Sequence, residues 1–459
     1  MPTDVAPTIA DLHAAYAAGE PPRAAIAALY RRIAVVDDPG IFIHLRAEAD
    51  VLADAARLPA FDPARFPLWG VPVAVKDNID VAGLPTTAAC PAFAHVPDRS
   101  AAVVDKLVAA GALVIGKTNL DQFATGLVGV RSPYPIPRNA FDPTRVPGGS
   151  SSGSAIAVAQ GIVPIALGTD TAGSGRVPAG LNDLVGLKPS LGAVSTRGVL
   201  PACRTLDCVS VFSRTPDDAW RTYEVLRGFD AEDAYSRSVA ADTPATAPPL
   251  RTLGLPRAAD RLFFGDAAMA DAFEASLGLL APLAGATAPV DLTPFFAVAK
   301  LLYEGPWVAE RHAAMRSFLA TNAGDVHPVT RQIVEAAGRF SATDAFEGLY
   351  RLADLRRATE QVWTRVDALV VPTAPVFPML ADLAADPIGP NNRLGTYTNF
   401  VNLLDLAALS VPGPFRADGL PAGITLIGPR GSDAALMRLG AAFVAAAGDR
   451  RRPAASVAA

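Results

Sequence analysis

The sequence predicts an α/β fold, in which a sheet of buried strands is covered by helices. Two short apolar runs, 71–75 (VPVAV) and 112–115 (ALVI), are bounded by Gly or Pro, as is typical of buried strands. Between them, residues 100–110 follow a helical pattern, and Ser100 is suited to capping the first turn. A strand, a helix and a second strand in this order form the repeating pattern of α/β proteins.

The rest of the chain fits the same interpretation. Residues 8–35 repeat apolar side chains at helical spacing and predict an N-terminal helical region. Residues 241–251 are rich in Pro and Ala, so we expect an internal boundary there, and residues 266–365 have mostly helical character. Two later apolar runs, 368–372 and 422–427, return to strand character, so we expect the sheet to be completed late in the chain.

The composition excludes several classes of protein. The 459 residues are 51% hydrophobic, which is ample for a large core, and their formal net charge is −5. Nucleic acid and anionic membrane are not expected partners, because binding to either needs clustered positive charge. The three cysteines (Cys90, Cys203 and Cys208) form no CxxC pair, and the five histidines are scattered. Neither a disulfide framework nor a metal site is therefore predicted.

The beginning of the sequence does not resemble a signal peptide. Asp4 and Asp11 lie where such a peptide needs a basic start and an apolar run. The longest uncharged stretch, 146–169, is broken by several glycines and by Pro164, so we interpret it as loop, helix and strand and not as a membrane span. We expect a cytoplasmic protein.

Residues 146–180 carry the strongest indication of chemistry. Two Gly/Ser loops, 148–154 and 171–175, flank a short apolar helix and a strand. Small residues let backbone approach a ligand closely, and consecutive N–H groups in such loops bind anions. The same residues are also compatible with ordinary turns around a core helix.

Three functional interpretations of this stretch compete. A nucleotide-binding loop requires GxxxxGK[ST], and no lysine follows either glycine cluster. A hydrolase elbow requires GxSxG after a strand; Ser151 stands in such a motif, but the preceding residues 138–147 contain two prolines and have loop character. The third interpretation uses Lys76 as a base, because it directly follows a buried strand and burial lowers the pKa of a lysine. Taken alone, Lys76 is better interpreted as an edge-strand lysine that points to water.

The combination of motifs resembles the amidase signature family. The matching segments are PVAVKDNID around Lys76, GGSSSGS at 148–154 and GTDTAGSGRVP at 168–178, with VGLKPSLG following at 185–192. The resemblance extends from about residue 8 to residue 445. It implies the family's fold, a central mixed β-sheet surrounded by α-helices, and a Lys–Ser–Ser triad with the middle serine on a cis peptide bond.

Carried over by position, the resemblance implies that Ser174 is the nucleophile, Ser150 the proton relay and Lys76 the final base. A serine hydroxyl is a poor nucleophile until a base removes its proton, and a neutral lysine acting through a second hydroxyl satisfies this need. The implied oxyanion hole consists of the backbone N–H groups of Thr171, Ala172, Gly173 and Ser174.

Asp170 and Arg176 flank the nucleophile, and we expect them to be a structural pair that holds the loop. The sequence departs from the family's common pattern at Ser152, Ala172 and Gly175. Ala172 keeps its N–H available for an oxyanion. Gly175 replaces a usual apolar residue, so we expect it to leave room beside Ser174 for a small or polar acyl group.

Other segments resemble the allophanate hydrolases within that family. They are residues 197–212, 399–429 and 300–311, and in the last of these the resemblance implies that Tyr303 and Arg311 bind the substrate carboxylate. A guanidinium is suited to bidentate recognition of a carboxylate. The implied function is hydrolysis of allophanate (urea-1-carboxylate), a small anionic amide, with release of ammonia through an acyl-enzyme.

The resemblance also implies a homodimer that uses neither a metal nor an organic cofactor. Allophanate hydrolases commonly carry a further C-terminal domain, so a chain with the amidase part alone is expected to complete only the first hydrolysis. Three alternatives remain open: an amidase acting on another small amide such as malonamate, the glutaminase component of a tRNA-dependent amidotransferase, and a ligand-binding member without catalysis.

These inferences divide the chain into five regions. We expect an N-terminal helical region (1–65), the core with the triad (66–240), a mainly helical substrate-pocket region (241–365), the completion of the core (366–445) and a mobile tail (446–459).

Overall fold

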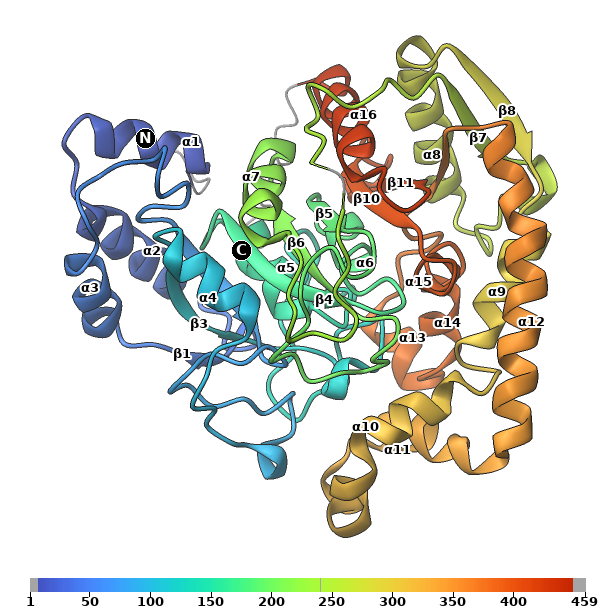
Figure 1. The fold of residues 1–459 in the computed structure, drawn as a ribbon, viewed down its shortest axis with the longest axis horizontal. Helices are drawn as coiled ribbons and strands as arrows, with labels where there is room; N and C mark the ends of the chain where they lie inside the picture. Colours follow the sequence, from blue (N-terminus) through green and yellow to red (C-terminus); the bar gives the residue numbers. More distant parts are fainter. Residues whose placement is uncertain (1–6, 240, 449–459) are drawn as a thin grey trace.

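The fold is built on an 11-stranded β-sheet with helices packed against it (Figure 1). The computed structural model describes residues 7–239 and 241–448. Neighbouring strands of the sheet follow the order β1 (Phe42–Leu45), β3 (Leu113–Thr118), β2 (Pro72–Lys76), β4 (Ile165–Asp170), β6 (Cys208–Ser213), β5 (Val185–Lys188), β10 (Ala407–Pro412), β11 (Gly423–Gly428), β9 (Ala368–Pro372), β7 (Thr252–Pro256) and β8 (Ala286–Val290). β2 runs parallel to β3 and β4, whereas β4 and β6 run antiparallel. The predicted central mixed sheet surrounded by helices is confirmed.

The helices occur along the whole described chain. They are α1 (Ile9–Ala17), α2 (Pro22–Val36), α3 (Glu48–Ala56), α4 (Ala102–Ala109), α5 (Ser152–Ala159), α6 (Val177–Gly180), α7 (Pro216–Leu226), α8 (Ala267–Leu280), α9 (Thr293–Leu301), α10 (Trp307–Asn322), α11 (Pro328–Glu335), α12 (Ala342–Glu360), α13 (Leu380–Ala385), α14 (Gly389–Leu394), α15 (Asn399–Leu403) and α16 (Asp433–Ala446). In Figure 1 the long helix α12 runs along one side of the molecule, and α1 to α4 lie at the opposite side.

Strand β2 is buried on both faces, which explains its uninterrupted apolar sequence. Alternate side chains of a strand point to opposite faces of the sheet. Val73 and Val75 belong to a core cluster that includes side chains of α4 and α7, whereas Ala74 belongs to another cluster that includes α5. Every residue of β2 is buried, and its last residue, Lys76, is therefore surrounded by protein.

The N-terminal part of the chain follows the prediction, with one error. Residues 8–35 contain α1 and α2, and the runs 71–75 and 112–115 fall on β2 and β3. Ser100 does not cap the following helix, because α4 begins at Ala102 with Ala101 at the cap position. The Ser100 hydroxyl instead accepts a hydrogen bond from the backbone N–H of Ala82, at 2.9 Å.

The later strands also follow the prediction. The runs 368–372 and 422–427 correspond to β9 and β11, so the sheet does take strands from late in the chain. Residues 266–365 are mainly helical, from α8 to α12, but they include β8, which the sequence did not indicate. β8 lies at the end of the sheet and is mostly exposed, so it lacks the apolar run of a buried strand.

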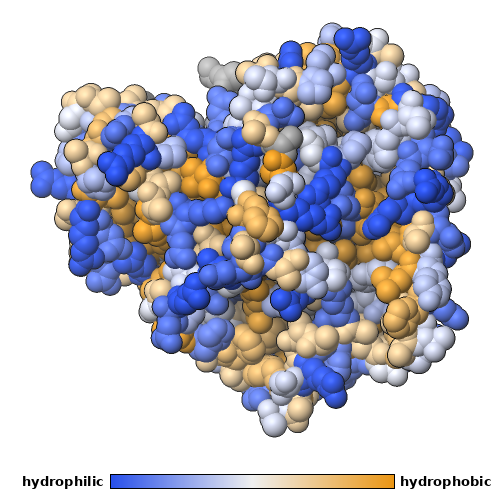
Figure 2. Space-filling model, in the orientation of Figure 1, coloured by the Kyte–Doolittle hydropathy of each residue, from blue (hydrophilic) through white to orange (hydrophobic). Residues whose placement is uncertain are grey.

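The surface in Figure 2 mixes charged and polar side chains with small apolar patches. Among the helices of residues 7–239 and 241–448, none combines the length and the apolar character needed to cross a bilayer. The predicted mobile tail, 446–459, lies outside the described residues from position 449 onward.

Candidate active site

Lys76 lies at the carboxyl end of β2, with its ammonium enclosed by hydroxyl groups. The residue is fully buried, and Nζ donates hydrogen bonds to Oγ of Ser150 at 2.8 Å and to Oγ1 of Thr169 at 2.7 Å. Burial lowers the pKa of Lys76 to about 7, although the negative charge of Asp121 acts in the opposite direction. A substantial fraction of Lys76 is therefore neutral near neutral pH, as a base requires.

Ser150 belongs to the serine loop, residues 148–154, which leads into α5. The Gly149–Ser150 peptide bond is cis, as the family resemblance implied for the middle serine. The backbone N–H of Gly149 donates to the carbonyl of Leu127, and the Ser150 carbonyl accepts from the N–H of Asp121. A Cβ at position 149 would lie 2.2 Å from Oδ2 of Asp121, so the close approach requires glycine.

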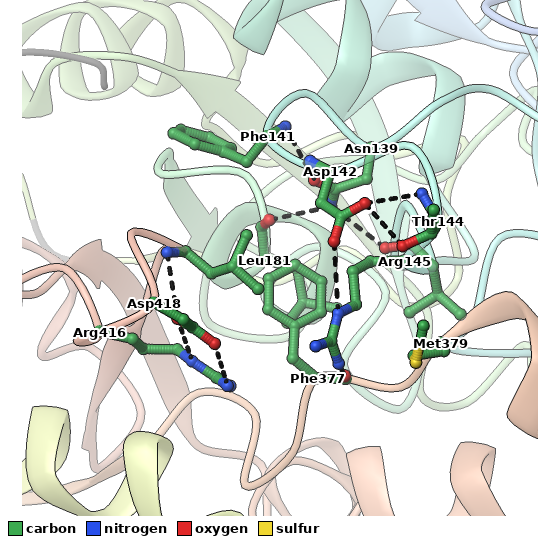
Figure 3. Close-up of polar contacts among 12 residues, drawn as sticks. Asn139, Phe141, Asp142, Thr144, Arg145, Leu181, Phe377, Met379, Arg416 and Asp418 are labelled. Carbon is green, nitrogen blue, oxygen red and sulfur yellow. Dashed lines mark hydrogen bonds and ion pairs between the residues drawn. The ribbon is translucent and has the colours of Figure 1, made fainter. Parts of the chain in front are cut away.

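The segment that enters the serine loop is held by charged side chains around Phe377 (Figure 3). Arg145 donates to the carbonyl of Phe377 at 2.5 Å and forms an ion pair with Asp142 at 3.6 Å. Arg416 pairs with Asp418 at 2.8 Å. The ring of Phe377 lies between the two guanidinium groups, 5.8 and 5.9 Å from their central carbons. The contacts of Arg145 hold the segment that precedes the serine loop against the segment that follows β9.

The Ser174 loop, residues 171–175, is closed by a buried ion pair. Both oxygens of Asp170 accept from Arg176, at 2.9 Å each, and also from the backbone N–H groups of Gly173 and Gly175, at 2.9 Å each. Burial alone would raise the pKa of Asp170, but the adjacent Arg176 guanidinium reverses this and lowers it. The geometry is that of a pair that shapes the loop. It also engages the N–H of Gly173, one of the four expected oxyanion donors.

Ser174 is buried, and its hydroxyl contacts the backbone of Gly126. It donates to the carbonyl of Gly126 at 3.4 Å, which is a long hydrogen bond. Within the described residues, the hydrogen bonds join Lys76 to Ser150 but do not join Ser150 to Ser174. In this conformation the structure therefore assembles two members of the expected triad directly and holds the third through the 125–126 segment.

The expectation for Gly175 is wrong. A Cβ at this position would lie 2.5 Å from Cβ and 2.6 Å from Oγ of Ser210 on β6. The space opened by the glycine is therefore occupied by Ser210 and is not available to an acyl group. Glycine at 175 allows the Ser174 loop to pack against the sheet.

Tyr303 and Arg311 lie in direct contact. Arg311 projects from α10 and is 1% exposed. Its Nη1 donates to Oγ1 of Thr125 at 3.2 Å and its Nη2 to the Tyr303 hydroxyl at 3.1 Å, with the guanidinium 5.0 Å from the Tyr303 ring centroid. Among the described residues Nε has no hydrogen-bond partner. A buried guanidinium with a free donor is suited to an anionic ligand.

The segment 125–126 connects Arg311 to Ser174. Thr125 accepts from Arg311, and the next residue, Gly126, accepts from Ser174. The segment is fixed in turn by Arg131, which is buried and donates to the carbonyl of Thr125 at 2.9 Å. The Ser174 hydroxyl and the Arg311 guanidinium therefore contact adjacent residues of one segment.

Sequence reasoning missed three polar residues of this region: Thr125, Thr169 and Asp207. Asp207 is nearly buried, and its carboxylate accepts from the hydroxyl of Thr171 at 2.5 Å. Burial raises the pKa of Asp207 to about 6. The parallel pairing of β2 with β4 could have indicated Thr169, because it places the ends of both strands side by side. Nothing in the local sequence distinguishes Thr125 or Asp207.

Metal and thiol chemistry have no visible basis in the described residues. No group of three or more His, Cys, Asp or Glu side chains within residues 7–239 and 241–448 is placed to hold a metal ion. The cysteines are buried and free. Burial raises the pKa of Cys203 to about 12 and that of Cys208 to about 11, so both thiols stay protonated.

Comparisons with known proteins find related sequences and structures. The family model described as amidase matches residues 24–437. The chain is 48% identical over 378 residues to a urea amidolyase of Lachancea kluyveri, a match that covers 82% of this chain and about one fifth (20%) of that protein. A glutamyl-tRNA(Gln) amidotransferase component of Symbiobacterium thermophilum is 37% identical, covering 90% of this chain and 91% of that protein. A solved Kluyveromyces lactis allophanate hydrolase superposes with a TM-score of 0.91 at 44% identity, covering 97% of this chain and 74% of that chain.

Proposed function

The chain belongs to the amidase family, and we propose that it hydrolyses allophanate, a small amide that carries a carboxylate, with release of ammonia. One observation carries the proposal: Arg311 and Ser174 contact the adjacent residues Thr125 and Gly126. A nucleophile and a buried guanidinium held this close suit a substrate whose carboxylate lies near its amide carbonyl. The resemblance to proteins named urea amidolyase and allophanate hydrolase supports the same choice.

The proposed proton route begins at Ser174 and ends at Lys76. Ser174 attacks the amide carbonyl while its proton passes through Ser150 to the neutral amine of Lys76, which Ser150 already contacts at 2.8 Å. For this transfer, the Ser174 hydroxyl turns away from Gly126, a rotation about a single side-chain bond. The same relay returns the proton to the departing ammonia. Water then attacks the acyl-enzyme by the reverse path.

The oxyanion and the carboxylate are proposed to bind at opposite ends of this site. The N–H groups of Thr171, Ala172 and Ser174 are the oxyanion donors, since that of Gly173 is engaged by Asp170. Each donor fixed where the negative charge develops is worth on the order of 10²–10³ in rate. At the other end, the free Nε of Arg311 and the Tyr303 hydroxyl receive the substrate carboxylate.

We further propose that the protein works in the cytoplasm as a homodimer, in urea degradation, without a metal or organic cofactor. The role in urea degradation is suggested by the names of its relatives. The other three proposals rest on the resemblance to the family. Light scattering of the purified protein tests the dimer, and a monomer at assay concentration contradicts it.

The deciding experiment measures ammonia released per molecule of substrate from allophanate, malonamate, biuret and glutamine, with Ser174→Ala as the variant. We expect allophanate to give the highest kcat/KM and Ser174→Ala to abolish turnover. Preference for glutamine would instead favour the glutaminase component of an amidotransferase, the second candidate, which the similarity to the Symbiobacterium thermophilum protein supports. Failure of a fluorophosphonate probe to label Ser174 would favour a ligand-binding member without catalysis.

The carboxylate site has its own test. Arg311→Ala should lower kcat/KM for allophanate by roughly 10–100-fold, mainly through KM, because a charge-assisted contact is lost. An unchanged KM contradicts the assignment of Arg311.

A further inference from the structure

Asp207 stands where three separate parts of the site meet. It directly precedes β6, which pairs with β4 so that Cys208 lies opposite Asp170. This pairing brings the Asp207 carboxylate beside the Ser174 loop, where Oδ1 accepts from the Thr171 hydroxyl at 2.5 Å. Asp207 thus reaches a residue of the proposed oxyanion hole without reaching the nucleophile itself.

The same carboxylate holds the turn that precedes it. Oδ2 of Asp207 accepts from the N–H of Ala202 at 2.8 Å, and Oδ1 accepts from that of Cys203 at 3.2 Å. The backbone N–H of Asp207 also donates to the Cys203 carbonyl. Turn 202–207 and the Ser174 loop are therefore attached to one carboxylate.

Turn 202–207 is also attached to the helix that carries Arg311. The backbone N–H and the hydroxyl of Thr205 donate to the two oxygens of Glu310, at 2.6 and 2.8 Å. Glu310 immediately precedes Arg311 on α10. A chain of hydrogen bonds thus runs from the Ser174 loop through Asp207 and the turn to the proposed carboxylate site.

We infer that Asp207 is a positioning residue, which fixes the Ser174 loop at a set separation from Arg311 and so selects substrates by the distance between their carbonyl and carboxylate. This inference rests on the proposed function. A residue that only supported the fold would affect all reactions at Ser174 equally. A residue that sets the separation affects most the substrates that are bound at both ends.

The test compares a reaction bound at both ends with one bound at the Ser174 end. Thr171→Val removes the hydroxyl that donates to Asp207. Asp207→Asn removes the negative charge and replaces one of the two acceptor oxygens with an NH2 group, which weakens the contacts of the carboxylate with the Ser174 loop and with turn 202–207. We expect each variant to lower kcat/KM for allophanate by on the order of 10–100-fold. The rate of Ser174 labelling by a neutral fluorophosphonate, which has no carboxylate, should fall much less. Thr171→Ser keeps the hydroxyl and should restore most of the activity.

A double-mutant cycle with Arg311→Ala gives the sharper measurement. Once the carboxylate anchor is gone, the separation no longer matters, so Asp207→Asn should have little further effect. The inference is overturned if the losses of kcat/KM in Asp207→Asn and Arg311→Ala multiply in the double variant. It is also overturned if Asp207→Asn lowers the rate of Ser174 labelling as much as it lowers kcat/KM for allophanate. Asp233→Asn is the matched control, because Asp233 also accepts from backbone N–H groups, those of Thr196 and Tyr235, and lines the same surface pocket as Asp207. It should behave as wild type.

The outcome is independent of which substrate is correct. If the wild-type protein hydrolyses malonamate and not allophanate, the proposed substrate is wrong, yet the same cycle on malonamate still tests Asp207. If the wild-type protein hydrolyses allophanate but the losses of kcat/KM caused by Asp207→Asn and Arg311→Ala multiply in the double variant, the proposed function stands and the positioning role of Asp207 is wrong.

Discussion

Two buried lysines lie on neighbouring parallel strands, and their surroundings give them different chemistry. Lys76 at the end of β2 and Lys117 on β3 are both fully buried. Lys117 forms an ion pair with Asp77 at 3.0 Å, whereas Lys76 contacts the hydroxyls of Ser150 and Thr169. A carboxylate partner stabilises the charged ammonium and offsets the cost of burying it. Neutral hydroxyls offset much less of this cost, so they favour the neutral amine. Burial lowers the pKa of both lysines, but for Lys117 the charge of Asp77 and its hydrogen bond act in the opposite direction. The nearest partner therefore decides how well a buried lysine is suited to act as a base.

Replacing each lysine by methionine should separate the two roles most strongly. Lys76→Met should lower kcat/KM for allophanate by roughly 10²–10⁴-fold, because the proposed base is lost. Its free energy of unfolding in urea should stay the same or rise, since an apolar side chain replaces a buried amine. Measurable turnover at the wild-type rate contradicts the assignment of Lys76.

Lys117→Met should have the opposite profile. It leaves the buried Asp77 carboxylate without its cation, which should lower the free energy of unfolding by about 3–5 kcal/mol. Activity per folded molecule should remain close to wild type. Urea denaturation followed by circular dichroism, together with an active-site titration, measures both quantities. A Lys117→Met protein of full stability but no activity would remove the contrast.

The pH dependence of kcat/KM should be set by the protonation of Lys76 and not by that of Lys117. The proposed reaction needs neutral Lys76, and its pKa is about 7, so protonation removes the base as pH falls below 7. We expect log kcat/KM to rise by about one for each pH unit below 7 and to level above it. Asp207, with its pKa raised to about 6 by burial, should steepen the fall below pH 6. A value of kcat/KM that does not fall as the pH drops below 7 contradicts a lysine base.

The smallest expected effect concerns the hydroxyls next to each lysine. Thr169→Val removes an acceptor from Lys76 Nζ and should lower kcat/KM by about tenfold, because the amine is held less firmly toward Ser150. Thr86→Val removes the matching acceptor from Lys117 and should leave kcat/KM unchanged, because the ion pair with Asp77 persists. Steady-state ammonia release compares the two variants, and equal losses would show that neither hydroxyl has a specific role.

Sequence patterns predicted the strands that are apolar and buried, and the Gly/Ser loops. The strands at 71–75 and 368–372 were predictable because burial on both faces leaves an uninterrupted apolar run. β8 was not predictable, because it is mostly exposed at the end of the sheet and lacks an apolar run. Ser100 was assigned to the wrong partner, since capping depends on where the helix begins and not on residue type alone.

The site shows the same division. Lys76, Ser150 and Ser174 stand in recognisable motifs, so the sequence could suggest them as the proposed triad. Thr125 and Asp207 owe their place to contacts between segments that are far apart in the chain, with a separation of 186 positions between Thr125 and Arg311. Gly175 was misinterpreted for a related reason: the space beside a glycine depends on which strand packs against it.

Strands β10 and β11 lie in the middle of the sheet although they follow all its other strands in the chain (Figure 1). They pair with β5 on one side and with β9 on the other. While the ribosome is still adding residues 407–428, both of those older strands present unpaired edges. Such edges readily pair with other chains, so the nascent protein passes through a stage at which it is prone to aggregation. That stage ends only when the late hairpin inserts and joins the two halves of the sheet.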